Sequence, residues 1–476
     1  MNLYIDNHKF HYEMENLCRA FLFTEDVAVI HEFNRPEKPY ILTSVHDEVR
    51  VELCTDMLSE TLTAPLCDDN ELMMGVLLYR LLSKAYDREL PWGILTGVRP
   101  IKLFSKLALE KGVGEAERYF TDTLLVSEEK TRLSRLVFDN QREILSRSDK
   151  RSFSLYVSIP FCPSRCNYCS FVSQSIEKAK KLIEGYLPLL LSEIRYTSQI
   201  ARELDLRLES VYIGGGTPTT LSAEQLDILL SEIRDYFDMS GCYEFTVEAG
   251  RPDTVTREKL TALKKHGVSR ISINPQTFND SVLEHIGRRH NSQQTVDAYR
   301  LARELGFDNI NMDLIAGLTT DTPESFNRTI DTVLELDPES VTVHTLAVKR
   351  SARLNSSDAV REQTYTARML DYAADSLTQG GYEPYYLYRQ SKMLSNLENI
   401  GWAKKGYFSP YNVYIMEETH SILACGAGAV TKLRDVNSDY LERIFNFKYP
   451  YEYISRFDEL LERKARIKSF YSEYNE

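Results

Sequence analysis

Three cysteines stand close together in the run Phe161-Cys162-Pro163-Ser164-Arg165-Cys166-Asn167-Tyr168-Cys169. The C-x3-C-x2-C spacing places three thiolates on one short loop, where they can hold three irons of a 4Fe–4S cube. The fourth iron then has no protein ligand, and an open coordination position is typical of catalytic metal sites rather than structural ones. The loop therefore predicts a cluster that can bind a small molecule at its free iron.

Two other uses of these cysteines are zinc binding and a disulfide. Zinc prefers a fourth Cys or His close by, and no His lies in the loop; a disulfide would leave an odd thiol. The other five cysteines are scattered along the chain, which suits reduced thiols in the cytoplasm. We expect them to be mainly core residues: Cys18, Cys54, Cys67, Cys242 and Cys425.

The length of 476 residues allows two or three domains, and the net charge of −13 argues against nonspecific binding to nucleic acid or acidic membranes. No basic region followed by an apolar run opens the chain, so no signal peptide is expected. No stretch approaches 18 uninterrupted apolar residues, so no transmembrane helix is expected either. The sequence thus predicts a cytoplasmic protein.

From about residue 149 the sequence alternates between strand-like and helical patterns, which is typical of parallel strands joined by crossover helices. Six units of this kind are too few for an eight-stranded barrel, so the fold class expected is α/β with a partial (β/α)6 barrel. Strands are predicted at 153–159, 210–213, 244–248, 270–274, 309–315 and 340–345. Helices are predicted at 180–203, 223–237, 257–266, 280–286, 292–305 and 323–336.

The predicted domains are an N-terminal α+β domain of unknown role at 1–148, the barrel core at 149–385, and a C-terminal extension at 386–476 with a glycine-rich turn and a helical tail. Within the first domain, strands are expected at 26–33, 40–44 and 49–54, and a helix at 71–86. Arg99, in the turn that follows, could bind an anion or simply stabilise the turn.

Chemistry in barrel proteins gathers where strands end and the following loops begin. The second predicted strand runs into Gly214, Gly215, Gly216 and Thr217. Consecutive glycines let the backbone lie directly against a ligand, because no side chain intervenes. This loop is therefore a candidate binding site.

Polar residues follow the next three strands. Glu248 ends the third strand and could accept hydrogen bonds from ribose hydroxyls or an ammonium group, or form an internal salt bridge. Arg270 and Gln276 belong to the fourth strand and its end; an arginine near the cluster could grip a carboxylate, and the glutamine suits neutral hydrogen bonding. Asp313, flanked by apolar residues, is expected to be half-buried and either paired or functional.

The sixth strand ends at His344 and leads to Lys349 and Arg350, which could hold substrate carboxylates or form a solvated basic pair. His290 lies in a connecting loop, where it is expected to cap a helix or pack. Asn412 precedes a second glycine-rich turn at 426–429, another place of close backbone approach.

Together these motifs resemble the radical S-adenosylmethionine (SAM) superfamily. The run 156–162, the glycine-rich run 214–219, Glu248, Arg270 with Gln276, and the run 313–318 resemble the oxygen-independent coproporphyrinogen III oxidase (coproporphyrinogen dehydrogenase) family. The runs 96–100, 248–253 and 415–418 resemble its HemZ-type branch. The wider resemblance covers about residues 151–432.

The resemblance implies roles for these residues. Cys162, Cys166 and Cys169 would hold the cluster, and Tyr156 would pack or hydrogen-bond near it. The backbone of Gly215 to Thr217 would meet the amino group of SAM. Glu248, Gln276 and Asp313 would contact SAM, and better-known members of the family hold a second SAM.

Two departures from the family pattern concern the C-terminal part. Heme-chaperone relatives carry a His-Asn-x-x-Tyr-Trp motif before the glycine-rich turn, whereas residues 411–416 here read Tyr-Asn-Val-Tyr-Ile-Met. The family's C-terminal helical domain is also shortened, since few residues follow Ala429. The first departure weakens the interpretation as a heme chaperone.

The resemblance implies an enzyme that decarboxylates two propionates of coproporphyrinogen III to give protoporphyrinogen IX in anaerobic heme biosynthesis. An electron donor such as flavodoxin or ferredoxin is its expected partner, together with a tetrapyrrole substrate. Two alternatives stay open: a radical SAM enzyme that opens or methylates another tetrapyrrole, and a protein that binds and delivers heme.

Overall fold

The computed structural model describes residues 1–22, 25–56, 58–169, 174–346, 356–390 and 397–474. These divide into two compact units. One unit contains residues 1–139, 345–367 and 387–399, and the other contains residues 140–344, 368–386 and 400–476. The three domains expected from the sequence, 1–148, 149–385 and 386–476, remain a prediction.

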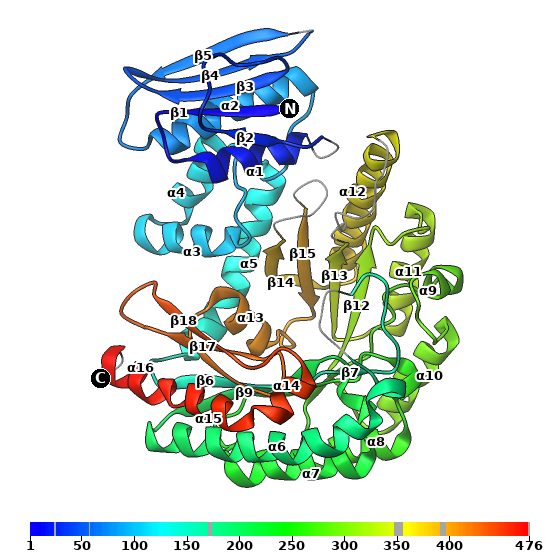
Figure 1. The fold of residues 1–476 in the computed structure, drawn as a ribbon. Helices are drawn as coiled ribbons and strands as arrows, with labels where there is room; N and C mark the ends of the chain where they lie inside the picture. The colour runs from blue at the N-terminus through cyan, green and yellow to red at the C-terminus, as the bar shows by residue number, and fades with distance from the viewer. Residues whose placement is uncertain (23–24, 57, 170–173, 347–355, 391–396, 475–476) are drawn as a thin grey trace. The chain divides into compact units, whose positions relative to one another are not determined.

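The first unit contains a five-stranded sheet with helices packed on it (Figure 1). The strand order is β2 (Ala28–Ile30), β1 (Asn2–Asp6), β3 (Tyr40–Val45), β4 (Glu48–Cys54) and β5 (Ser59–Pro65). Helices α1 (His11–Phe21) and α2 (Asn70–Tyr86) share one apolar core with the sheet. Every second residue of β4 faces this core: Val49, Val51 and Leu53 are fully buried.

The sequence prediction for this unit was incomplete. It found β3, β4 and α2 but missed β1, α1 and β5, and it made the strand around Ala28–Ile30 too long. Short strands give little periodic signal, and β1 is held by pairing in parallel with both β2 and β3. The helices that follow are α3 (Pro100–Lys111), α4 (Val113–Arg118) and α5 (Glu128–Arg147).

The second unit is built on the six strands predicted from the sequence, which lie side by side in chain order. They are β6 (Ser152–Ile159), β9 (Arg207–Gly215), β10 (Glu244–Glu248), β11 (Arg270–Ser272), β12 (Ile310–Ala316) and β13 (Ser340–Thr345). The pairs from β6 to β12 are parallel. The sheet ends at β14 (Glu383–Arg389) and at β18 (Leu441–Phe445) without closing on itself, so the prediction of a partial barrel is confirmed.

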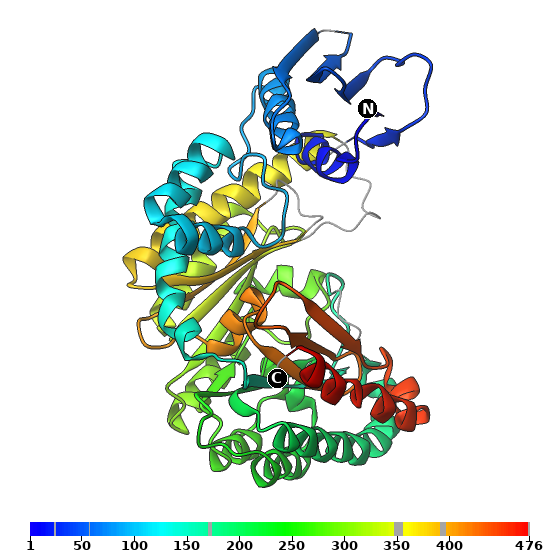
Figure 2. The same cartoon turned by 90° about the vertical axis from the view of Figure 1, so that its left-hand side faces the viewer.

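Helices follow the strands and lie along the outer side of the curved sheet (Figures 1 and 2). They are α6 (Ile176–Glu203), α7 (Ala223–Tyr236), α8 (Arg257–Lys265), α9 (Asp280–His285), α10 (Ser292–Glu304) and α11 (Pro323–Leu336). Local sequence fixes their starts: Ser222 with Gln225, and Asn291 with Gln294, form capping boxes. Apolar residues alternate with others along these strands: Phe153, Leu155, Val157 and Ile159 of β6 are fully buried, while Tyr156 is partly exposed.

The C-terminal part adds strands as well as helices. After α12 (Ser356–Gln379), β15 (Glu398–Ala403) and α13 (Pro410–Glu417), strand β16 (Ser421–Cys425) pairs in parallel with β6. Strand β17 (Val430–Arg434) and β18 continue the sheet in antiparallel fashion. The expected helical tail is present as α14 (Pro450–Ser455), α15 (Phe457–Lys464) and α16 (Arg466–Tyr474), and α14 and α15 pack against α6.

Among the helices that the structure describes, none combines the length and hydropathy that a membrane span requires.

Candidate active site

The cysteine loop begins directly after β6. Cys162 ends the short strand β7 (Phe161–Cys162), which pairs in parallel with β8 (Gln174–Ser175). The loop closes on itself through the Cys169 N–H, which donates to the Cys166 carbonyl at 3.2 Å, and the Asn167 N–H donates to the carbonyl of Ile286 at 3.1 Å. All three cysteines are partly exposed. The fold therefore presents them at the carboxyl end of the first barrel strand.

The glycine-rich loop is bound to the same strand end. The Gly216 N–H donates to the Ile159 carbonyl at 2.8 Å, and the Thr217 N–H donates to the Phe161 carbonyl at 2.7 Å. A Cβ on Gly216 would stand 2.6 Å from the Phe161 carbonyl oxygen, so a side chain is excluded there. Gly215 has a φ of +103°, a backbone conformation that favours glycine. The glycines thus let this loop lie against the segment that leads to Cys162.

Glu248, the last residue of β10, is half-buried beside β9. Tyr212 Oη donates to its Oε1 at 2.6 Å. Burial raises the pKa of Glu248 to about 7, with a further increase from Asp313, while the bond from Tyr212 and the charges of Arg270 and His344 act the other way. The contact that the structure describes for this carboxylate is a tyrosine hydroxyl, not the alternative of an internal salt bridge.

Asp313 lies within β12 and is also half-buried. Asn311 Nδ2 donates to its Oδ1 at 2.7 Å, and Asn274 Nδ2 donates to its Oδ2 at 2.8 Å. His344 Nε2 is 3.9 Å from Oδ2. Burial alone would raise the pKa of Asp313, but His344, Asn311 and Arg270 outweigh it and hold the pKa below its ordinary value. Asp313 is therefore an ionised, well-supported carboxylate.

Gln276 has an unusual backbone for a residue other than glycine. Its φ is +67°, and hydrogen bonds hold it to β12 on both sides. The Gln276 N–H donates to the Asp313 carbonyl at 2.9 Å, and the Ile315 N–H donates to the Gln276 carbonyl at 3.0 Å. Strained backbone that is fixed in this way is often found at functional sites.

Arg270 occupies the first residue of β11, at the opposite end of the strand from the loop that carries Gln276. It is fully buried, and its Nη2 donates to Ser340 Oγ at 3.3 Å. Burial would lower its pKa, but Tyr385 and Glu244 outweigh this effect and raise it. Its described partners lie inside the barrel, so the structure does not bring Arg270 into contact with the cysteine loop.

Three tyrosine rings are stacked inside the barrel. Tyr212 and Tyr411 have ring centroids 4.4 Å apart, and Tyr156 lies 6.3 Å from each of them. Tyr156 comes from β6 and Tyr212 from β9, while Tyr411 comes from α13. Tyr411 is buried, and Tyr156 and Tyr212 remain partly exposed. Sequence reasoning singled out only Tyr156.

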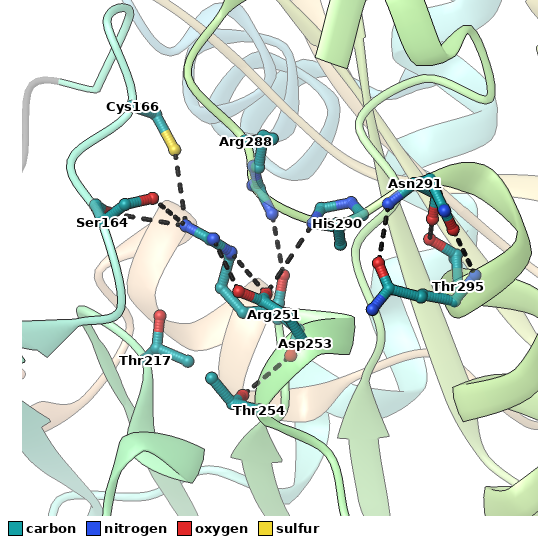
Figure 3. Close-up of polar contacts among 12 residues, drawn as sticks. Ser164, Cys166, Thr217, Arg251, Asp253, Thr254, Arg288, His290, Asn291 and Thr295 are labelled. Carbon is teal, nitrogen blue, oxygen red and sulfur yellow. Dashed lines mark hydrogen bonds and ion pairs between the residues drawn. The ribbon is translucent and has the colours of Figure 1, made fainter. Parts of the chain in front are cut away.

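A charged cluster lies beside the cysteine loop (Figure 3). Arg251 donates to both oxygens of Asp253, at 2.9 Å each, and its Nη1 is 3.9 Å from Cys166 Sγ. Arg288 Nη2 donates to Tyr168 Oη at 2.9 Å. His290, expected to cap or pack, is buried with its Nδ1 3.8 Å from Asp253 Oδ1.

Sequence reasoning quoted the runs that contain Arg251 and Arg288 but gave these residues no role. The available signal was an arginine placed just after a strand end in an Arg-Pro-Asp run. Lys349 and Arg350, the proposed basic pair, lie outside the described residues.

The donors around the thiols suit an iron–sulfur cluster. Thr217 Oγ1 donates to Cys162 Sγ at 3.6 Å, and a buried guanidinium faces Cys166. Each contact places a hydrogen-bond donor beside a candidate ligand sulfur, as is common around metal-bound cysteines. Among the described residues, no three His, Cys, Asp or Glu side chains are grouped so that they could hold a single metal ion.

Comparison with known proteins agrees with this arrangement. The family model described as "Radical SAM superfamily" matches residues 156–333. The protein "Oxygen-independent coproporphyrinogen-III oxidase-like protein HemZ" of Bacillus subtilis is 38% identical over 387 residues, which cover 79% of this chain and 76% of that protein. "Heme chaperone HemW" of the same organism is 34% identical over 63% of this chain and 77% of that protein.

A solved structure is similar as well. The coproporphyrinogen III oxidase HemN from Escherichia coli, described as a radical SAM enzyme, matches with a TM-score of 0.51 and 25% identity. The match covers 67% of this chain and 71% of that one. The cofactors of the radical SAM superfamily are a 4Fe–4S cluster and SAM, as the cysteine loop and the resemblance predicted. The chain therefore belongs to the radical SAM superfamily, in the HemZ-type branch of the oxygen-independent coproporphyrinogen III oxidase family.

Proposed function

We propose that this protein oxidatively decarboxylates two propionate side chains of coproporphyrinogen III and so produces protoporphyrinogen IX. The observation that carries the proposal is the gathering of the cysteine loop, the glycine-rich loop and Glu248 at the carboxyl ends of β6, β9 and β10. The similarity to HemZ and to the solved HemN structure supports this choice of substrate.

In this proposal Cys162, Cys166 and Cys169 hold the cluster through three irons and leave one iron for SAM. Once reduced by a flavodoxin- or ferredoxin-like donor, such a cluster would supply reductive cleavage of SAM to methionine and a hydrogen-abstracting radical. Abstraction at the propionate β-carbon, with loss of CO2 and transfer of one electron to an acceptor, would leave a vinyl group. The protein supplies positioning and a water-poor site for this chemistry.

The glycine-rich loop would bind the amino group of SAM through carbonyl oxygens. The N–H groups of Gly216 and Thr217 are already used by Ile159 and Phe161, and an ammonium group needs acceptors. Carbonyls of this loop are acceptors that lie next to the segment leading to Cys162. The absence of side chains on Gly214 to Gly216 lets the loop pack against Glu248, Ser158 and Phe161, which keeps these carbonyls at the strand ends.

Glu248, Gln276 and Asp313 are the proposed polar contacts to SAM. An ionised Asp313 can accept hydrogen bonds from ribose hydroxyls. Glu248 titrates near pH 7, so it can hold or release a proton under physiological conditions. Arg270 would act indirectly, as a buried positive charge that balances the carboxylates of the barrel interior.

The tyrosine stack gives one side of the site an aromatic surface. Tyr156 and Tyr212 keep part of their surface exposed, so a ligand can pack on them, while Tyr411 holds their rings from α13. Aromatic faces bind flat, apolar groups and exclude water. Such a surface suits pyrrole rings or the adenine of SAM.

Delivery of heme is the second candidate, because HemW of Bacillus subtilis is a relative. Residues 411–416, which correspond to the chaperone motif, contact other side chains of this protein. Tyr411 stacks on Tyr212, and Asn412 Nδ2 donates to Tyr385 Oη at 3.0 Å. No histidine is present in this stretch to bind heme iron. A radical SAM reaction on another tetrapyrrole is the remaining alternative.

The deciding experiment is anaerobic turnover. Reconstituted protein receives dithionite, SAM and coproporphyrinogen III, and mass spectrometry follows the products. We expect loss of two CO2 units with matching 5′-deoxyadenosine, abolished in Cys166→Ala and retained in Cys67→Ala, whose thiol is exposed in the other unit.

Two other results would support a different function. If 5′-deoxyadenosine forms while the porphyrinogen stays intact, the radical site is supported and the substrate is wrong. If neither forms despite an intact cluster, and heme binds stoichiometrically without SAM, delivery of heme replaces turnover.

A further inference from the structure

Arg251 is a buried arginine between the cysteine loop and the turn after β10 (Figure 3). Only 3% of the residue is exposed. Asp253 holds one side of its guanidinium with two hydrogen bonds of 2.9 Å. On the other side Nη1 donates to Ser164 Oγ at 3.1 Å and lies 3.9 Å from Cys166 Sγ. The side chain thus joins a carboxylate to the loop that carries the cluster ligands.

The turn itself does not need this guanidinium. The Thr254 N–H donates to the Arg251 carbonyl at 2.9 Å, and Thr254 Oγ1 donates to the same carbonyl at 2.7 Å. Pro252 starts the short helical turn Pro252–Thr254. Backbone and hydroxyl contacts therefore close the turn, and the charged end of Arg251 is available for another role.

The charges around Arg251 do not cancel. Arg288 is a second, half-buried arginine, bonded to Tyr168 Oη and to the Gly250 carbonyl at 3.2 Å. Burial lowers the pKa of His290 to about 4, with help from Arg288 and Arg251, so His290 is neutral at pH 7. Asp253 is left as the anion of the group, facing two cations. Buried charge without balance is costly, so an anion in the cysteine loop would stabilise the group.

We propose that Arg251, held by Asp253, is a positioning residue that directs a positive charge at the Cys166 ligand and raises the reduction potential of the cluster. Reduction adds one electron, supplied by a low-potential donor, and so adds one negative charge to the cluster. A nearby cation and an N–H donor to a ligand sulfur both favour the reduced state. The inference rests on the cluster part of the proposed function and not on the choice of substrate.

The test is a redox titration of the reconstituted cluster without substrate, followed by electron paramagnetic resonance. For Arg251→Gln we expect the ratio of reduced to oxidised cluster at a fixed potential to fall about tenfold, which equals a decrease of about 59 mV for one electron. Arg251→Lys keeps the charge but loses the two-pronged contact with Asp253, so its potential should recover in part.

Asp253→Asn separates a charge effect from loosening of the loop. This variant removes a negative charge beside Arg251, so we expect its potential to rise, opposite to Arg251→Gln. Loosening of the loop would move both variants in the same direction. Arg257→Gln, at an exposed ion pair with Glu304, serves as the control and should match the wild-type protein.

Iron and sulfide content are measured for every variant. If Arg251→Gln does not retain a cluster, the other two variants test the inference. The reduction potential must then fall in Arg251→Lys and rise in Asp253→Asn. Unchanged potentials, or shifts in one direction for both Arg251 and Asp253 variants, overturn the inference. A wild-type protein that assembles no 4Fe–4S cluster would instead contradict the proposed function.

Discussion

A Cβ on Gly214 would stand 2.8 Å from Glu248 Oε1. It would also stand 2.8 Å from Cε1 of Tyr212, the residue that donates to this carboxylate. Glycine is therefore needed at the end of β9 because the side chain of the neighbouring strand occupies the space of a Cβ. The glycine-rich loop makes room for one of the proposed SAM contacts as well as for a ligand.

The first prediction follows from this contact. Gly214→Ala should push Glu248 and Tyr212 away from their positions and weaken SAM binding at least tenfold, about 1.4 kcal/mol. Anaerobic calorimetry of the reconstituted protein measures the affinity. Gly114→Ala is the control, because a Cβ there meets nothing within 4 Å. Equal affinity in Gly214→Ala and wild type would remove Glu248 from the SAM site.

The second prediction concerns the ionisation of Glu248. Its pKa of about 7 means that the carboxylate is half protonated at neutral pH. If the ionised form accepts hydrogen bonds from SAM, affinity should rise as pH increases from 6 to 8. Glu248→Gln should bind SAM more weakly and without this dependence. A wild-type affinity that stays flat across this range would argue against the contact.

The same shift has a consequence for stability. The folded protein holds the Glu248 proton up to about pH 7, whereas the unfolded chain releases it at the ordinary value for glutamate, 4.5. The contribution of Glu248 to stability is therefore fully present below 4.5 and is lost as pH rises to 7. Relative to wild type, Glu248→Gln should gain stability as pH rises from 4.5 to about 7, and not beyond, as measured by chemical unfolding.

The third prediction concerns a buried ion pair near the C-terminus. Lys464 Nζ lies 3.1 Å from Glu193 Oε1, and Glu193 also accepts hydrogen bonds from the Gly426 N–H at 2.7 Å and Tyr453 Oη at 2.6 Å. Removing one partner leaves a buried charge, so Lys464→Met should cost about 3–5 kcal/mol in the free energy of unfolding.

Two further variants test this explanation by urea unfolding. Lys468→Met breaks a surface pair with Glu203 and should cost less than about 1 kcal/mol. Adding Glu193→Leu to Lys464→Met should restore part of the lost stability, because the uncompensated charge is gone. A loss below about 1 kcal/mol in Lys464→Met would contradict the burial of this pair.

The fourth prediction concerns acid stability. His420 is buried, and its ring nitrogens lie 2.8 Å from Ser148 Oγ and 2.8 Å from Ser154 Oγ. Burial lowers its pKa to about 3. In the unfolded chain His420 binds a proton below about pH 6.5, whereas in the folded protein it stays neutral. The free energy of unfolding should therefore fall by up to about 1.4 kcal/mol per pH unit below 6.5. His420→Gln should lack this part of the slope, while His285→Gln, at an exposed position, should keep it.

The sequence determined the six core strands of the second unit, their helices and the cysteine loop, whereas strands β16, β17 and β18 were not predicted. Apolar runs, caps such as Ser222 with Gln225, and glycines at turns are local signals, so all six strands and their helices were predicted close to their observed bounds. The motif spacing also sufficed to predict the cluster and its superfamily. In the first unit, β1 was missed because it is short, and β5 was missed because this edge strand has no buried residue and little apolar pattern.

Only the tertiary structure decided which side chains meet. Tyr411 lies far along the chain from Tyr212, and Arg251 reaches Cys166 because β10 and β6 end at the same edge of the sheet. Arg270 shows the reverse case, since its place at the start of β11 directs it to Ser340 inside the barrel. Local patterns specify strands and turns, whereas contacts between distant segments depend on strand order and on the direction of each side chain, which no local pattern contains.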